Sequence, residues 1–436
     1  MSRFLTHKQL HEVLFGFLQE KDILNYRSIG SVCDALVLHY AQTQLQDVMG
    51  QDLSIIEGPA LWTSDAFPNE VVTPSRTIPA TFVNLLVACG VGISQIVTTS
   101  AAGARSLSSR LLESDWYSHR TKAFRAILNA VTVDWAQTLL HVDITATRDV
   151  GDDLLYRVAR PQSPLVSLKV KSALGITDAA IKLVAINCRH LRFLDVSCGR
   201  QISDDFIALI AANCHELQAL DISSTHGKIT DRSMKNIALG CPQLLALNVS
   251  FNGGVISDES IKAVAMNCKR LRSLNVRDSG GRITDDAIKL VAANCLRLQE
   301  LIVSGSKGSI TDESMKLVAT HCPGLRSLNI SESNGHITDA SMKLLAERCT
   351  ELRSLDICCT RDITDETLKV VAEHCRNLEF LNVTMTDDNL TDASMLLVAV
   401  NCRQLRYVKC SGTWRGLTRV WVPMLPPKCA VYDDDF

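Results

Sequence analysis

The feature that most constrains this chain is a repeated segment with a period of 26 or 27 residues. Residues 310–331 read ITDESMKLVATHCPGLRSLNIS, and residues 337–358 read ITDASMKLLAERCTELRSLDIC. Thr-Asp or Ser-Asp pairs begin at positions 177, 203, 230, 257, 284, 311, 338, 364 and 391, and cysteines stand at 188, 214, 241, 268, 295, 322, 349, 375 and 402. A unit this short cannot bury its own apolar residues, so the pattern predicts a solenoid of stacked units.

Each unit has the local signals of a helix followed by a short strand. Thr311 has the side chain of a good helix N-cap, and Asp312 places negative charge at the positive end of the helix dipole. Lys316 falls on the opposite, outer face of the helix. The apolar spacing predicts one buried face made of Met315, Val318, Ala319, Cys322, Leu325, Leu328 and Ile330.

Parallel stacking of such units predicts an α/β solenoid that curves, because narrow strands line one side and wider helices the other. The pattern L-x-x-L-[DN]-[VI]-S, then I-T-D, then a helix ending in cysteine, resembles the cysteine-containing class of leucine-rich repeats over residues 165–410. The resemblance implies a right-handed horseshoe, with a parallel sheet on the concave face and helices on the convex face. Where that family usually has Cys or Asn, this chain has Gly199, Thr225, Asn252, Ser279, Ser306, Ser333, Thr360 and Thr386. We expect the hydroxyl groups there to bond the backbone of the turn.

The sixteen cysteines favour reduced thiols over disulfides. The chain is large, and charged residues interrupt its first apolar stretch, so a secretory signal is not expected and the cytoplasm or the nucleus fits better. There is no CxxC pair, and the adjacent Cys358 and Cys359 lack the usual metal-ligand spacing. We therefore expect the repeated cysteines to pack in the core, with no cofactor and no metal.

The first fifty residues resemble an F-box, a small helical domain that docks onto the adaptor of cullin–RING ubiquitin ligases. The apolar positions that carry the resemblance, and that it assigns to adaptor binding, are Leu10, Val13, Leu14, Leu18, Ile23 and Leu24. The pattern departs from the family: Thr6 stands where proline is preferred, extra residues separate Ile23 from Val32, and the tryptophan after Cys33 is missing. The alternative is a pair of amphipathic helices that caps the solenoid.

The remaining segments divide the chain further. We expect a linker at 51–77, a divergent repeat with an insertion at 78–138, the repeat array at 139–412, and a C-terminal cap with an acidic tail at 413–436. Residues 78–97 carry no charge, and we interpret them as a helix ending at Cys89 before a strand at 93–99. A membrane span is the alternative. Residues 100–138 fit no repeat register.

Several function classes do not fit the chain. It lacks P-loop, GxGxxG, GxSxG and HExxH motifs, so we expect no enzyme activity. A net charge of −2 does not indicate nucleic-acid binding. A long concave sheet suits a protein partner, and distinctive side chains are the expected contacts. The candidate target-binding residues are Phe193, Asp195, Asp221, Phe251, Arg277, Asp278, Glu300, Glu332, Asp356, Phe380, Met385 and Tyr407.

These features lead to two hypotheses of different classes. In the first, the chain is the substrate-recognition subunit of a cullin–RING ubiquitin ligase. It would be a monomer within that complex, with the adaptor on the N-terminal helices and a protein substrate on the concave face. In the second, it is a scaffold or inhibitory binding protein with no link to ubiquitin. Both predict a protein partner, and neither requires nucleic acid or a membrane.

Overall fold

The computed structural model describes residues 78–79, 106–108, 112–113, 141–144, 151–173, 175–199, 201–334, 336–386, 389–412 and 417–432. The helices are α8 Asp152–Val158, α9 Asp178–Asn187, α10 Asp204–Asn213, α11 Asp231–Gly240, α12 Asp258–Asn267, α13 Asp285–Asn294, α14 Asp312–His321, α15 Asp339–Arg348, α16 Asp365–His374 and α17 Asp392–Asn401. A short 3₁₀ helix, η6, spans Val422–Met424. The main strands are β4 His141–Asp143, β5 Ser167–Lys169, β6 Phe193–Asp195, β7 Ala219–Asp221, β8 Ala246–Asn248, β9 Ser273–Asn275, β10 Glu300–Ile302, β11 Ser327–Asn329, β12 Ser354–Asp356, β13 Phe380–Asn382 and β14 Tyr407–Lys409.

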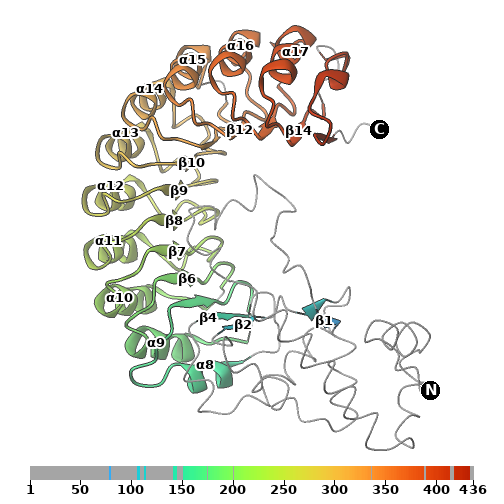
Figure 1. Cartoon of the computed structure of the whole chain (residues 1–436). Coiled ribbons are helices and arrows are strands. Elements are labelled where there is room, and N and C mark those ends of the chain that lie inside the picture. Colours follow the sequence, from blue (N-terminus) through green and yellow to red (C-terminus); the bar gives the residue numbers. More distant parts are fainter. Residues whose placement is uncertain are drawn as a thin grey trace, which may run out of the picture.

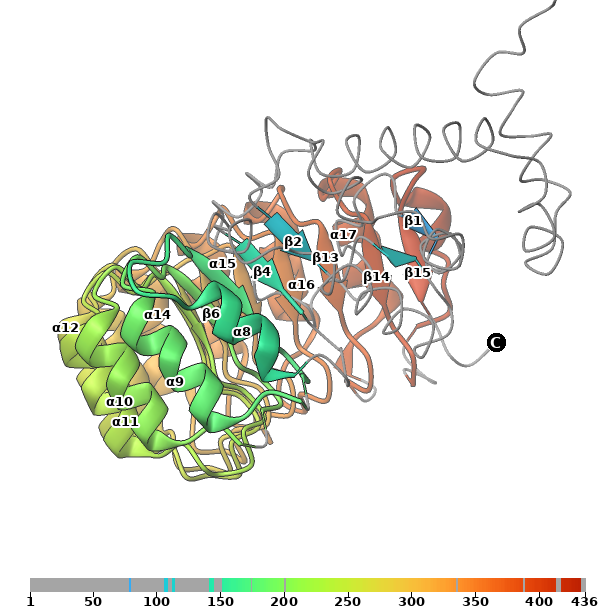
Figure 2. The same ribbon diagram turned by 90° about the horizontal axis from the view of Figure 1, so that it is seen from below.

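One parallel sheet runs the length of the described chain. It has thirteen strands there, in the order β15-β14-β13-β12-β11-β10-β9-β8-β7-β6-β5-β4-β2, with β15 at Ala430–Tyr432 and β2 at Ser106–Ser108. Sequence neighbours pair without offset, so that Leu301 lies between Leu274 and Leu328. The strands line the inside of an arc and the helices its outside (Figures 1 and 2). The predicted α/β solenoid of leucine-rich repeats is confirmed.

The sheet extends further toward the N-terminus than the sequence indicated. Residues 106–108 form β2, which pairs in parallel with β4. Our statement that 100–138 fits no register is therefore wrong at this strand. Its three residues carry little of the repeat signature, and pairing with β4 places them. A separate two-stranded sheet joins β1 Ile78–Pro79 to β3 Leu112–Glu113. The predicted F-box, the linker, and the helix and strand expected at 82–99 lie outside the described residues.

The apolar core follows the predicted register of each unit. In the repeat that contains α14, the fully buried side chains are Met315, Val318, Ala319, Cys322, Leu325, Leu328 and Ile330, while Lys316 is exposed. The middle residue of each strand points into this core, so its two neighbours face the concave side. Trp421 is fully buried in the same core beyond the last repeat. Trp414 lies outside the described residues.

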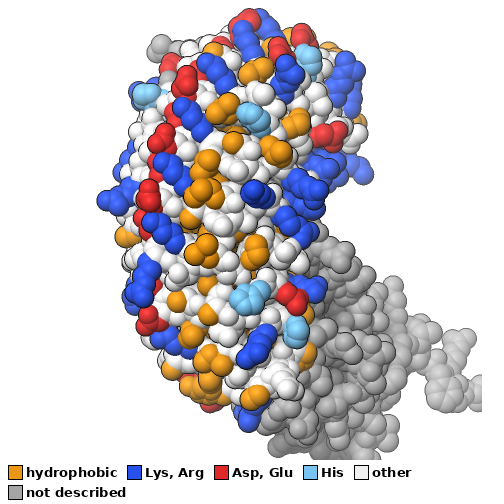
Figure 3. Space-filling model, turned by 90° about the vertical axis from the view of Figure 1, so that its left-hand side faces the viewer, with side chains coloured by type: hydrophobic (Ala, Val, Ile, Leu, Met, Phe, Trp, Pro, Cys, Tyr) orange, Lys and Arg blue, Asp and Glu red, His pale blue; other side chains and the backbone are white. Residues whose placement is uncertain are grey.

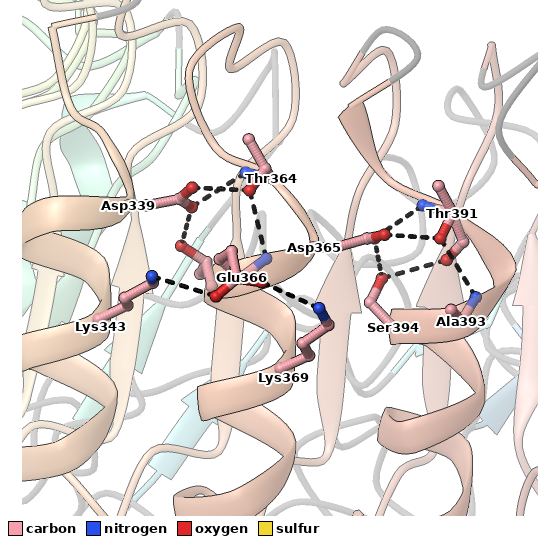
Figure 4. Close-up of polar contacts among 10 residues, drawn as sticks. Asp339, Lys343, Thr364, Asp365, Glu366, Lys369, Thr391, Ala393 and Ser394 are labelled. Atoms are coloured by element: carbon pink, nitrogen blue, oxygen red, sulfur yellow. Dashed lines mark hydrogen bonds and ion pairs between the residues drawn. The ribbon is translucent and has the colours of Figure 1, made fainter.

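The repeated Thr-Asp pair joins successive units (Figure 4). Asp339, the first residue of α15, accepts hydrogen bonds from the backbone N–H of Thr364 at 3.0 Å and from its hydroxyl at 2.7 Å. The Thr367 hydroxyl donates to the same carboxylate. Thr364 caps α16 in turn by accepting from the N–H of Glu366 at 3.2 Å. Threonine is thus the expected N-cap, whereas the aspartate mainly accepts hydrogen bonds from the next repeat and so connects the two helices.

The repeated cysteines form a second ladder, at the other end of the helices. Each thiol from Cys214 to Cys402 lies 3.5–3.8 Å from the carbonyl oxygen of the preceding ladder cysteine. Burial raises the pKa of these thiols to about 11 or 12. They are protonated at neutral pH, and each is a weak second donor to a carbonyl oxygen that already accepts the backbone N–H of the leucine three residues later.

The side chains at the position that closes each strand do not all bond the turn backbone, as we predicted they would. The hydroxyls of Thr225, Thr360 and Thr386 donate to the carbonyl oxygen three residues earlier, at 3.1, 2.6 and 2.9 Å. The same expectation is wrong for the three serines. Their hydroxyl oxygens are buried without a hydrogen-bond partner, and they belong to Ser279, Ser306 and Ser333. Serine lacks the second branch that restricts χ1 of threonine, so nothing fixes its hydroxyl toward the carbonyl.

Candidate functional site on the concave face

The concave face carries a row of carboxyl and amide side chains in the third position of the strands. Asp195 accepts from the backbone N–H of Ser197 at 3.0 Å, and Asp221 from that of Ser223 at 2.8 Å. Asn248, Asn275, Asn329, Asp356 and Asn382 make the same bond to the residue two positions later. These are Asx turns, which end each strand. None of the seven side chains belongs to a residue more than 9% exposed.

The row is therefore mainly structural. We expected Asp195, Asp221 and Asp356 to present carboxylates to a partner, but each turns back on its own strand end. Burial raises the pKa of Asp221 to about 7, with the neighbouring Asp195 as a further cause, and burial likewise raises the pKa of Asp195 and of Asp356. The amide of Asn248 stabilises this part of the row by donating to Asp221 at 3.0 Å.

The row is interrupted at β10. Ile302 stands where the neighbouring strands from β6 to β13 have Asp or Asn, and the hydroxyl of Ser304 is buried without a partner. Glu300, at the first position of β10, is 3% exposed. One of its oxygens accepts from Ser273 at 2.5 Å, and the other has no hydrogen-bond partner. Burial raises the pKa of Glu300 to about 7.

A second row of side chains lies on the turns directly after the strands. Phe251, Asp278, Glu332 and Met385 have φ of +55°, +52°, +56° and +51°, in the left-handed region. We predicted these four on the sheet, and that placement is wrong, because each comes after its strand has ended. The sequence shows that these residues depart from the repeat consensus. It does not show where the preceding strand ends, because the Asx turn decides that.

Two of these turn residues, Phe251 and Asp278, form one cluster with Arg277, which we call the Phe251 cluster. The guanidinium of Arg277 lies 5.0 Å from the ring centroid of Phe251. The Nε of Arg277 also pairs with Asp278 at 3.2 Å. Phe251 is 44% exposed, so much of its ring faces solvent. An aromatic ring and an arginine held together at a surface are typical of the residues that carry binding energy at protein interfaces.

The remaining predicted residues lie nearer the two ends of the sheet. Phe193 is half-buried against Ala219 and Ala246 of the neighbouring strands. Phe380 is 1% exposed, with the Lys409 ammonium 5.8 Å from its ring centroid.

Tyr407 stacks on Tyr432 of β15, with ring centroids 6.2 Å apart. The sequence interpretation missed Tyr432, which is 43% exposed. The short apolar alternation Ala-Val-Tyr after the prolines at 426 and 427 was the available signal.

The convex face is built differently (Figure 3). Charged side chains there pair between neighbouring helices, as in Lys235–Glu259 at 3.3 Å and Lys262–Asp286 at 3.3 Å. Exposed apolar side chains also occur on the helices and on the turns that follow them, such as Leu239 of α11 at 72% and Leu296 after α13 at 57%. Exposed ion pairs of this kind contribute little stability.

Two further features bear on the class of function. Among the described helices, none is both long and apolar enough to cross a bilayer. Within the same part of the chain, no three His, Cys, Asp or Glu side chains are grouped so that they could hold a metal ion.

Comparison with known proteins gives a likeness of fold. No protein-family model matches the chain, and no curated protein matches it. Among solved structures, a chain of the yeast Rad7–Elc1 complex is 18% identical over 72% of this chain and 91% of its own length, with a TM-score of 0.45. The internalin inlF from Listeria monocytogenes is 19% identical over 72% of this chain and 82% of its own, with a TM-score of 0.45. The leucine-rich-repeat protein LegL7 from Legionella pneumophila is 16% identical over 60% and 88%, with a TM-score of 0.38. At these identities the likeness extends to the fold alone.

Proposed function

We propose that this solenoid is a protein-recognition module that acts by binding and not by catalysis. The Phe251 cluster is the centre of its target surface. The observation that carries the proposal is a bulky aromatic residue in the left-handed conformation with 44% of its surface exposed. Glu332 and Met385 occupy the same place in later repeats and are also exposed, so the surface continues along the row of turns.

The left-handed φ belongs to this turn in most repeats. Gly305 and Gly412 hold it with φ of +67° and +70° without a steric cost, whereas the other repeats hold it with small or polar residues or with Met385, and Phe251 is the one aromatic residue among them in the described repeats. A non-glycine residue there costs on the order of 1–2 kcal/mol, and a large aromatic one is uncommon. Such strain persists where a side chain has a role that glycine cannot fill. Exposure of the Phe251 ring indicates that this role lies outside the core.

The test compares two substitutions to glycine. Phe251→Gly should raise the stability of the fold by about 1 kcal/mol, because it relieves the left-handed conformation. It should also remove the proteins that co-purify specifically with the full-length wild type. Ser224 is the matched control, since it has φ of +55° at the same place in the preceding repeat. Ser224→Gly should stabilise the fold in the same way and keep the partners.

The outcomes separate binding from stability. Melting is measured on both variants, and their co-purified proteins are quantified against the wild type by mass spectrometry. If Phe251→Gly retains every specific partner in wild-type amounts, the cluster is not a binding surface. If it loses stability, the argument from backbone strain is wrong.

We further propose that the recognised protein is a ubiquitination substrate. In this proposal residues 1–50 bind the adaptor of a cullin–RING ligase through Leu10, Val13, Leu14, Leu18, Ile23 and Leu24. The support is the F-box pattern of the sequence, and these residues lie outside the described part of the chain. The alternative, a scaffold or inhibitory protein without ubiquitin chemistry, is the other outcome of the test.

The adaptor proposal is tested on the full chain. Leu14→Ala combined with Leu18→Ala should abolish co-purification of the adaptor while the melting temperature of the solenoid stays unchanged. Leu239→Ala combined with Leu296→Ala is the control, because it also shortens two leucines and both are exposed in the repeat array. A solenoid that melts earlier in the first double variant, with no adaptor on the wild type, would support the capping alternative.

A further inference from the structure

Three sulfur atoms lie in series on two neighbouring turns of the solenoid. The Sγ atoms of Cys358 and Cys359 lie 3.2 Å apart, and the Cys359 Sγ lies 3.9 Å from the Sδ of Met385. Both cysteines are partly exposed, and Met385 is 57% exposed. The repeated cysteines of the helix ends are instead fully buried. This cluster therefore combines close sulfur contacts with access from solvent.

The backbone holds the two turns at this spacing independently of the sulfur atoms. The N–H of Cys359 donates to the carbonyl oxygen of Thr384 at 2.9 Å, directly beside Met385. The N–H of Cys358 donates to Asp356 at 3.0 Å, and its carbonyl oxygen accepts from Glu332 at 3.0 Å. Cys359 and Met385 have the left-handed φ of their row, +56° and +51°. Their side chains thus leave the backbone from fixed neighbouring positions, as a preorganised ligand set requires.

We propose that Cys358, Cys359 and Met385 form a three-sulfur binding site for a soft monovalent metal ion, Cu(I). Thiolate and thioether sulfur together select Cu(I) over hard cations, which take oxygen ligands. Structural zinc sites use four protein ligands, so a set of three that includes a thioether is a poor zinc site. Binding forms three Cu–S bonds and releases the two thiol protons to solvent. The metal enters as Cu(I), so no electron is transferred.

The site is not a cluster of three His, Cys, Asp or Glu side chains, and the described residues offer no such cluster. Here the third donor is a methionine from the following repeat, 26 residues after Cys359. The site shares Met385 with the proposed target surface, but Cu(I) binding is measured without a protein partner and so is tested independently of that surface.

The experiment titrates Cu(I) into the reduced full-length chain without oxygen, in competition with a chromogenic Cu(I) chelator. The wild type should retain one tightly bound Cu(I). Removing a residue that merely supports a metal ligand already weakens affinity by about 10–100-fold, so loss of a ligand in Cys359→Ser should weaken it by more than about 100-fold. Met385→Leu keeps the volume but loses the sulfur, and should weaken affinity by at least about 10-fold. X-ray absorption should find three sulfur neighbours in the wild type and two in Met385→Leu.

Cys198→Ser is the matched control. Cys198 has φ of +58° at the same place after β6 and is partly exposed like Cys359. Its substitution should leave Cu(I) affinity at the wild-type value. Melting of each copper-free variant checks that the fold is intact. The proposal fails if Cys359→Ser binds Cu(I) as tightly as the wild type, or if Cys198→Ser weakens binding equally.

Discussion

The hydrogen bonds between each Asp at a helix start and the Thr of the next repeat form a ladder along the solenoid. This ladder predicts that Asp339 contributes more to stability than Glu366, an exposed ion-pair residue nearby with as many partners. Asp339 accepts from the N–H and the hydroxyl of Thr364 and from the hydroxyl of Thr367. Thr367 is fully buried, so in Asp339→Ala its hydroxyl would lose its partner where water cannot replace it. A hydrogen bond to a charged group contributes about 1.5–3 kcal/mol. Because Asp339 itself is partly exposed, we expect a total loss of about 3–5 kcal/mol.

Asp339→Asn separates the hydrogen bonds from the charge. The amide oxygen can still accept from the N–H of Thr364 and the hydroxyl of Thr367, while the NH2 group replaces the oxygen that accepts from the Thr364 hydroxyl. The charge, its helix-dipole contribution and that one accepted hydrogen bond are lost, about 1–2 kcal/mol. Glu366→Ala is the control. Glu366 pairs with Lys343 at 3.3 Å and Lys369 at 2.9 Å, but all three side chains are exposed, and the loss should stay below about 1 kcal/mol. Figure 4 shows both arrangements on the same helix start.

The pH dependence gives a second measurement on the same variants. Burial raises the pKa of Asp339, but the hydrogen bonds from Thr364 and Thr367 outweigh it, and the net pKa lies below the usual 3.8. The folded state therefore prefers the carboxylate. The advantage of the wild type over Asp339→Asn is complete above about pH 4 and shrinks as the pH falls through the folded pKa.

Urea unfolding at pH 7 and at acid pH, followed by circular dichroism, measures both effects. If Asp339→Ala and Glu366→Ala unfold at the same urea concentration, the ladder does not hold the repeats together. An advantage over Asp339→Asn that grows on acidification would contradict the assigned pKa direction.

Three further outcomes are expected. Leu328→Ala should lower the free energy of unfolding by about 2–5 kcal/mol and Lys316→Ala should leave it nearly unchanged, because the first is fully buried and the second exposed; equal denaturation midpoints would contradict the register. Glu300 has its pKa raised by burial to about 7 from 4.5, so the folded state retains a proton that the unfolded chain releases, and stability should fall as the pH rises from about 4.5 to 7. Glu300→Gln should reduce that slope, leaving the part that comes from buried aspartates such as Asp221, and stabilise the protein at pH 8 by about 2–3 kcal/mol, as unfolding curves across this pH range would show. Ser306→Thr should stabilise by about 1 kcal/mol in thermal melting, since a threonine hydroxyl at this place reaches the turn carbonyl; a drop in melting temperature would mean that the methyl group does not fit.

The sequence alone was enough to predict the helix–strand unit, its buried register and the way the units stack. Helical and strand periodicities are local properties. The positions that Val318 and Leu328 occupy in their repeat are therefore core positions in the other repeats as well. A repeat also removes the usual ambiguity of topology, because each unit can bury its apolar face only against its own neighbour. The N-terminal resemblance concerns residues outside the described chain and stays a prediction.

The tertiary structure decided what the polar residues do. Asp312 has the sequence signature of a helix-dipole residue, yet its partner Thr338 is 26 positions away. Phe251 has the signature of a strand residue, yet it lies on a turn because an Asx bond ended the strand before it. Glu300 is an ordinary glutamate in sequence, and only its burial moves its pKa to about 7. Apolar burial depends on periodicity, which is visible along a chain. Hydrogen bonding and desolvation depend instead on which atoms meet across repeats, and that is defined only once the units are stacked.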